Sequence, residues 1–166
     1  MAEHKPGDAR SAKLRGPIMA AVDFSSCSEA ALLLAGDLAA ALASRLIVLH
    51  VVHDPANMPG YYQGKVRKKT LSRMEDLAGE RLDTFLAEVR TKHPECQALQ
   101  KAEVLLVKGL PVTRILEVAE KQKVGMVVIG SKGTTGLRPL LLGSVAAQVV
   151  SLAKRPVTVV REEQEH

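Results

Sequence analysis

The sequence has few aromatic residues and few cysteines. Its 166 residues include two tyrosines, two phenylalanines and no tryptophan, so the core must be built mainly from aliphatic side chains. Cys27 and Cys96 lie far apart without metal-binding spacing, which favours free thiols in a reducing compartment. No apolar run approaches the roughly 20 residues that span a bilayer. The polar segment 1–15 lacks the apolar stretch of a secretory signal. These absences predict a cytoplasmic protein without a membrane-spanning segment.

The chain is basic, with a formal net charge of +5 and a pI of about 9.4. Part of the excess lies in residues 1–15 and part in the run 65–69. Neither segment has interleaved aromatic residues, and no nucleic-acid-binding motif is present. The basic residues therefore indicate a solvated surface, and a nucleic-acid partner is not expected.

Short apolar segments alternate with amphipathic ones, which is typical of a parallel sheet with right-handed helical crossovers. The spacing of Ser26 and Glu29 is that of a capping box and predicts a helix start at Ser26. Strands are expected at 17–22, 45–52, 102–107, 126–129 and 156–160, and helices from Ser26, over 68–91, from Pro111 and over 145–154. We expect one α/β domain over residues 17–161, a disordered arm over 1–16 and a tail over 162–166.

A glycine-rich loop follows the strand expected at 126–129 and precedes the helix expected at 145–154. Its glycines are spaced Gly130-x2-Gly133-x9-Gly143-Ser144, which is neither the P-loop pattern nor the dinucleotide-binding pattern. Glycine lets the backbone approach a ligand closely, and a helix start offers unpaired N–H groups and a positive dipole end. This order of strand, loop and helix predicts an anion site suited to phosphate.

The glycine spacing resembles the nucleotide-binding signature of the universal stress protein family. The resemblance extends from Gly143 through Val150 to the segment 155–161, and less densely back to about Pro17. It implies a single doubly wound α/β domain with a five-stranded parallel sheet in the order 3-2-1-4-5 and helices on both faces. In that order the cleft lies between strands 1 and 4, at their carboxyl ends.

The resemblance also implies the nucleotide-binding residues. They are Ala21, Val22, Asp23, Val51, Ile129, Gly130, Ser131, Lys132, Gly133, Gly143, Ser144, Val145 and Ala146. Asp23 would accept the exocyclic amino hydrogen of adenine, Val51 would contact the base through its backbone, and the glycine loop would hold the phosphates. Without the resemblance, Asp23 and Ser144 could each be a helix cap, and Lys132 could pair with phosphate or point to solvent.

The segment 53–64 is rich in proline, glycine and asparagine and holds both tyrosines, Tyr61 and Tyr62. It leaves the strand that contains Val51, so it starts at the rim of the expected cleft. Two interpretations remain open. The segment could close over bound nucleotide, or it could be a connector whose tyrosines pack on the following helix.

Two other doubly wound families share the expected sheet. A response-regulator receiver needs an acidic cluster, but Asp23 has no adjacent acidic partner. A relative of the adenine-nucleotide α-hydrolases needs a glycine motif after its first strand, and the segment 23–28 contains no glycine. Both fit the sequence less well than the universal stress protein family does.

The sequence specifies no catalytic residues, because it lacks a Walker lysine, paired carboxylates and an evident Ser/His/Asp set. We therefore expect a regulatory or stress-response protein that binds ATP with little turnover. A divalent cation, Mg or Mn, could accompany the ATP and would be held by its phosphates and by no protein ligand. The alternatives are a slow Mg-dependent ATPase or phosphotransferase, and an interaction module that binds no nucleotide. The apolar segment Pro156–Val160 should form a sheet edge, and it suits the family's usual homodimer.

Overall fold

The computed structural model describes residues 16–53, 66–133 and 142–162, with the side chains of 66–72 excepted. Its elements in chain order are β1 (Ile18–Val22), α1 (Ser26–Ala41), β2 (Leu46–His53), α2 (Val66–Lys92), α3 (Gln97–Gln100), β3 (Glu103–Gly109), α4 (Pro111–Lys121), β4 (Met126–Gly130), α5 (Ser144–Leu152) and β5 (Val157–Val160). All neighbouring strands are parallel, and their order is β3-β2-β1-β4-β5. The predicted fold class and strand order are confirmed.

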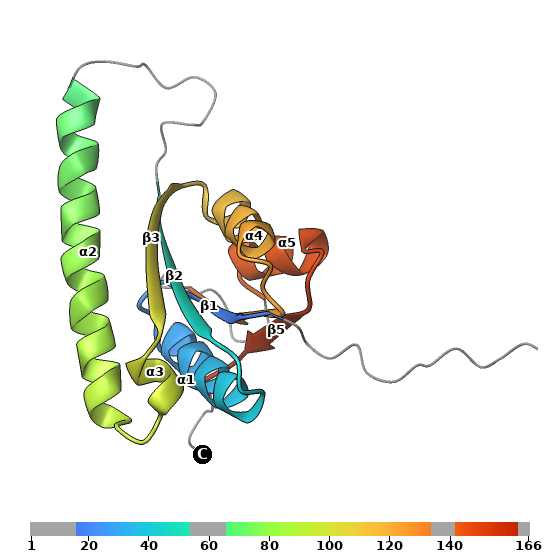
Figure 1. Ribbon diagram of the computed structural model, residues 1–166. Coiled ribbons are helices and arrows are strands. Elements are labelled where there is room, and N and C mark those ends of the chain that lie inside the picture. Colours follow the sequence, from blue (N-terminus) through green and yellow to red (C-terminus); the bar gives the residue numbers. More distant parts are fainter. Residues whose placement is uncertain (1–15, 54–65, 134–141, 163–166) are drawn as a thin grey trace, which may run out of the picture.

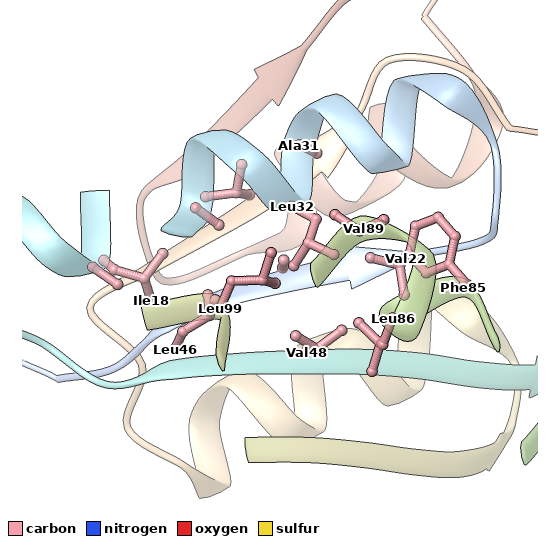
Figure 2. Close-up of a cluster of buried hydrophobic side chains, with 14 of the residues drawn as sticks. Ile18, Val22, Ala31, Leu32, Leu46, Val48, Phe85, Leu86, Val89 and Leu99 are labelled. Carbon is pink, nitrogen blue, oxygen red and sulfur yellow. The ribbon is translucent and has the colours of Figure 1, made fainter. Parts of the chain in front are cut away.

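Helices cover both faces of the sheet, with α1, α2 and α3 on one side and α4 and α5 on the other (Figure 1). Strand β1 is central and buried along its whole length because its side chains alternate between two aliphatic cores. Ile18, Ala20 and Val22 face the first core, where they pack with residues of α1, α2 and α3 (Figure 2). Met19 and Ala21 face the second core, with residues of α4 and α5.

Helix α1 begins at Ser26 as predicted, but its N-cap differs from the prediction by one residue. The N-cap is Ser25, whose hydroxyl accepts a hydrogen bond from the Ser28 amide at 3.2 Å. The predicted capping box at Ser26 is therefore wrong, because Ser26 is already the first helical residue. Glu29 instead forms an ion pair with Lys92 of α2 at 3.1 Å.

The apolar stripe of α2 is only partly as predicted. Leu82, Phe85 and Val89 are buried, and Leu86 joins them, whereas Met74 is 40% exposed. The short helix α3 was not predicted, and its Leu99 fills the end of the first core (Figure 2). Both cysteines are free thiols.

Several predicted features lie outside the described residues. They are the N-terminal arm apart from Gly16, the tail beyond Glu162, the middle of the glycine-rich loop and nearly all of the segment 53–64, including Tyr61 and Tyr62. Among the helices that the structure describes, none has the length and apolar character needed to cross a membrane.

Candidate functional site

The chain changes winding direction between β1 and β4, which pair through Ala21 and Ile129. A cavity of about 800 Å³ opens there, at the carboxyl ends of the strands. Ligands of doubly wound sheets bind at this kind of switch point. All of the binding residues that the family resemblance implied line this one cavity. Asp23 and Gly133, which are more than a hundred residues apart in sequence, thus meet at one site.

Asp23 follows β1 and uses only one of its two carboxylate oxygens for local hydrogen bonds. Its Oδ1 accepts from the Ser25 amide at 3.1 Å and from the Ser25 hydroxyl at 2.5 Å. Its Oδ2 faces the glycine-rich loop, so that a methyl group on Gly133 would lie 2.7 Å from it. Asp23 is therefore not the cap of α1, since Ser25 takes that position and leaves Oδ2 directed at the cleft.

Ser25 links the end of β1 to the glycine-rich loop. Besides Asp23, its hydroxyl contacts the carbonyl oxygen of Lys132 at 3.3 Å. Ser28 completes the network, because its hydroxyl donates to the Ser25 carbonyl at 2.9 Å and accepts from the Asp23 amide at 3.3 Å. Hydrogen bonds among Asp23, Ser25 and Ser28 therefore stabilise the turn between β1 and α1.

One backbone hydrogen bond joins the two ends of the glycine-rich loop, and a second connects the loop to β5. The Gly143 amide donates to the Ser131 carbonyl at 2.7 Å, and the Ser131 amide donates to the Val160 carbonyl at 2.7 Å. Gly143 is also the N-cap of α5, so Ser144 is not the cap but the first helical residue, and it is exposed. The amides of the first helical turn, at residues 144–146, have no acceptor within the helix and open toward the cavity.

The three described glycines of the loop, Gly130, Gly133 and Gly143, are each close to a different neighbour. A methyl group on Gly130 would lie 2.8 Å from the carbonyl carbon of Cys27, in the first turn of α1. On Gly133 it would meet the Asp23 carboxylate, and on Gly143 it would lie 3.2 Å from the Ser131 carbonyl oxygen. Gly130 is therefore required by helix packing, whereas Gly133 keeps space beside Asp23.

The cavity also contains residues that sequence reasoning did not assign to the site. Phe24 has a φ of 67°, a left-handed conformation that bulky residues rarely adopt. Its ring centroid lies 4.3 Å from that of His50 and 5.6 Å from that of Phe85. The guanidinium carbon of Arg81 lies 4.6 Å from the Phe24 centroid, a cation–π contact. The sequence contains only two phenylalanines, and both are in this cluster. That scarcity was the one feature of the sequence that could have drawn attention to them.

His50 lies within β2, beside Val22 of β1, and is half-buried at the rim of the cavity. Its Nδ1 lies 2.8 Å from the Val22 carbonyl oxygen, which can only accept, so Nδ1 carries the hydrogen. Burial lowers the pKa of His50, although the bond to Val22 and the charge of Asp23 oppose that effect. The imidazole is therefore neutral at pH 7, and its Nε2 is an acceptor.

No group of three or more histidine, cysteine, aspartate or glutamate side chains that could hold a metal ion occurs within residues 16–53, 73–133 and 142–162. The polar groups that line the cavity include the side chains of Asp23, His50, Arg81 and Lys132, together with the amides that begin α5. This combination suits a ligand with a hydrogen-bond donor at one end and an anionic group at the other.

Comparison with known proteins places the chain in a family. The family model described as the Universal stress protein family matches residues 15–161. Universal stress protein YxiE of Bacillus subtilis is 28% identical over 158 residues, covering 87% of this chain and 97% of that protein. The structure of MJ0577 from Methanocaldococcus jannaschii superposes with a TM-score of 0.64 at 26% identity, covering 89% and 96% of the two chains. A universal stress protein solved in complex with cAMP has a TM-score of 0.57 at 25% identity, covering 86% and 94%. The chain belongs to the universal stress protein family.

Proposed function

We propose that this protein binds ATP in the cleft between β1 and β4 and acts as a nucleotide-responsive regulatory protein with little turnover. The observation that carries the proposal is the position of the Asp23 carboxylate. Its Oδ2 has no hydrogen bond within the described residues 16–53, 73–133 and 142–162, and it faces the glycine-rich loop that leads into α5. A related protein of known structure was solved in complex with cAMP, which supports an adenine nucleotide as the ligand.

Asp23 would select adenine over guanine. Adenine carries an amino group at the position where guanine carries a carbonyl oxygen, and a carboxylate oxygen can only accept. Asp23 Oδ2 would therefore accept a hydrogen bond from adenine and repel guanine. The backbone of Val51, in the C-terminal half of the neighbouring strand β2, would provide the second contact to the base.

The phosphates would be held by the start of α5. The amides of Ser144, Val145 and Ala146 are available, and the positive end of the helix dipole favours an anion there. Gly143 would contribute through its lack of a side chain, because its amide is already bonded to Ser131. Lys132, whose Cα would lie 3.5 Å from a methyl group on Gly143, would add a positive charge for the phosphates. A divalent cation, Mg or Mn, would be held by the phosphates and would neutralise their charge.

Calorimetry with ATP and GTP on the wild type and on Asp23→Asn tests the proposal. We expect ATP to bind more tightly than GTP, and the ratio of the two affinities to fall in Asp23→Asn, since an amide can donate to guanine. One hydrogen bond to a charged group corresponds to about a 10- to 100-fold change in that ratio. Asp37→Asn is the matched control, because Asp37 is exposed on α1, outside the cavity.

The same samples separate the alternatives. Equal affinities for ATP and GTP in the wild type would contradict the role of Asp23. Binding of neither nucleotide, with none extracted from the purified protein, would favour an interaction module that uses the fold without a ligand. Steady release of phosphate under excess ATP would favour the slow ATPase, which needs a positioned nucleophile and charge stabilisation beyond binding.

A further inference from the structure

We propose that Ser25 is a positioning residue that sets the nucleotide specificity of the site by holding the Asp23 carboxylate in one orientation. The inference rests on the proposed function, because it concerns how Asp23 distinguishes adenine from guanine. Ser25 itself would touch no part of the nucleotide, and it does not line the cavity.

Asp23 is held from two sides. On one side the amide and hydroxyl of Ser25 both bond to Oδ1. On the other side Oδ2 occupies the space that a side chain on Gly133 would fill. A carboxylate bonded in this way cannot rotate away from this orientation without breaking two hydrogen bonds. Oδ2 therefore stays directed at the cleft before any ligand arrives, and such preorganisation favours affinity and specificity.

Ser25 is held just as firmly. It is the N-cap of α1, with extended backbone angles of φ −79° and ψ 158°, and its hydroxyl oxygen accepts from the Ser28 amide. A hydroxyl has one hydrogen, and the 2.5 Å contact to the charged Asp23 is shorter than the 3.3 Å contact to the Lys132 carbonyl. The Ser25 hydroxyl therefore donates its hydrogen to Asp23. Because Ser25 is fixed as the N-cap of α1, the carboxylate is fixed relative to the start of that helix.

Ser25 could instead serve only to cap α1, and the two roles predict different results. Glycine is nearly as good an N-cap as serine, whereas alanine is a poor one. Ser25→Gly therefore retains most of the capping but loses the hydroxyl that holds Asp23. Ser25→Ala loses both, and Ser25→Thr retains both. Ser26→Ala is the matched control, because the Ser26 hydroxyl bonds to the exposed Glu162 at 2.6 Å and not to Asp23.

The test has two readouts on these variants. The first is the ratio of ATP to GTP affinity from calorimetry. We expect Ser25→Gly and Ser25→Ala to lower the ratio by about tenfold, Ser25→Thr to restore it, and Ser26→Ala to leave it unchanged. Ser25→Gly combined with Asp23→Asn should have the ratio of Asp23→Asn alone, since both changes act through the same carboxylate.

The second readout needs no nucleotide. Side-chain coupling constants of Asp23, measured by NMR, should report one rotamer in the wild type and averaging in Ser25→Gly. If the wild type binds no nucleotide but the rotamer is released in the variant, the proposed function fails and the positioning by Ser25 stands. If Asp23 stays in one rotamer in Ser25→Gly, or if the affinity ratio is unchanged while ATP binds, Ser25 is only a cap and the inference is wrong.

Discussion

Alanine at Gly130 should destabilise the protein. The added methyl group would lie 2.8 Å from the carbonyl carbon of Cys27 and 3.0 Å from both its carbonyl oxygen and its Cβ. These atoms belong to the first turn of α1, which is packed on the sheet and cannot shift without disturbing the core. Overpacking of this kind costs about 1–3 kcal/mol, and the contact with backbone favours the upper end. Alanine also lowers the conformational entropy of the unfolded chain relative to glycine, which offsets about 0.4–1 kcal/mol of this destabilisation.

The net loss in the free energy of unfolding is therefore about 2 kcal/mol. For a chain of this size that corresponds to a fall of about 4–8 °C in the melting temperature. Gly130 lies in β4, and it would have this effect whether or not the protein binds a nucleotide.

The same substitution at Gly133 should leave stability nearly unchanged. There the methyl group would meet Asp23 Oδ2 at 2.7 Å, which is the end of a rotatable side chain. The carboxylate can move about 0.7 Å to ordinary contact distance by lengthening its hydrogen bonds to Ser25 without breaking them, so the free energy of unfolding should stay within about 0.5 kcal/mol of the wild type. That movement displaces the oxygen that would bond adenine, and nucleotide affinity should fall. Gly133→Val would add more bulk beside the carboxylate and should abolish binding.

Gly79→Ala provides the control for both. Gly79 lies within α2, and its methyl group would have an ordinary contact, 3.7 Å from Leu106 Cδ2. Alanine there should stabilise the protein by about 0.8–1 kcal/mol through helix propensity. Urea unfolding followed by circular dichroism measures all three variants, and calorimetry with ATP measures their affinities. Wild-type stability in Gly130→Ala, or an equal loss in Gly130→Ala and Gly133→Ala, would refute these assignments.

Two further predictions concern the sheet edge and His50. We propose a homodimer through Pro156–Val160. The carbonyl oxygens of Pro156 and Val160 accept hydrogen bonds from the β4 side of the sheet. Because the backbone groups of successive strand residues point to opposite sides, the Val159 amide points away from β4, toward the open edge. Val159→Pro should then yield a folded monomer by light scattering, and a wild type that is monomeric at micromolar concentration contradicts the dimer. The lowered pKa of His50 means that the unfolded state binds more protons, so stability should fall as pH drops through 6.5 and level off below the folded pKa. His50→Gln should flatten this dependence in urea unfolding across that range, and an unchanged slope would show that His50 does not cause it.

The sequence by itself determined the succession of elements and the location of the site. Apolar runs and amphipathic segments marked the five strands and the principal helices to within about two residues, because these patterns reflect local periodicity. Pro111 marked the start of α4 because proline suits the first turn. The glycine spacing, through its resemblance to a family, indicated the strand order and the residues that line the cavity.

Only the tertiary structure decided how the site is built. Ser25, Ser26 and Ser28 are nearly equivalent N-cap candidates in the sequence. In the structure the N-cap is Ser25, whose hydroxyl also contacts Asp23 and Lys132. The different roles of Gly130 and Gly133 depend on their neighbours, which are the first turn of α1 for Gly130 and the Asp23 carboxylate for Gly133. The cluster of Phe24, His50, Phe85 and Arg81 likewise joins three separate segments. Periodicity shows which face of an element is buried, but the partner across the interface is set by how the crossovers pack on the sheet.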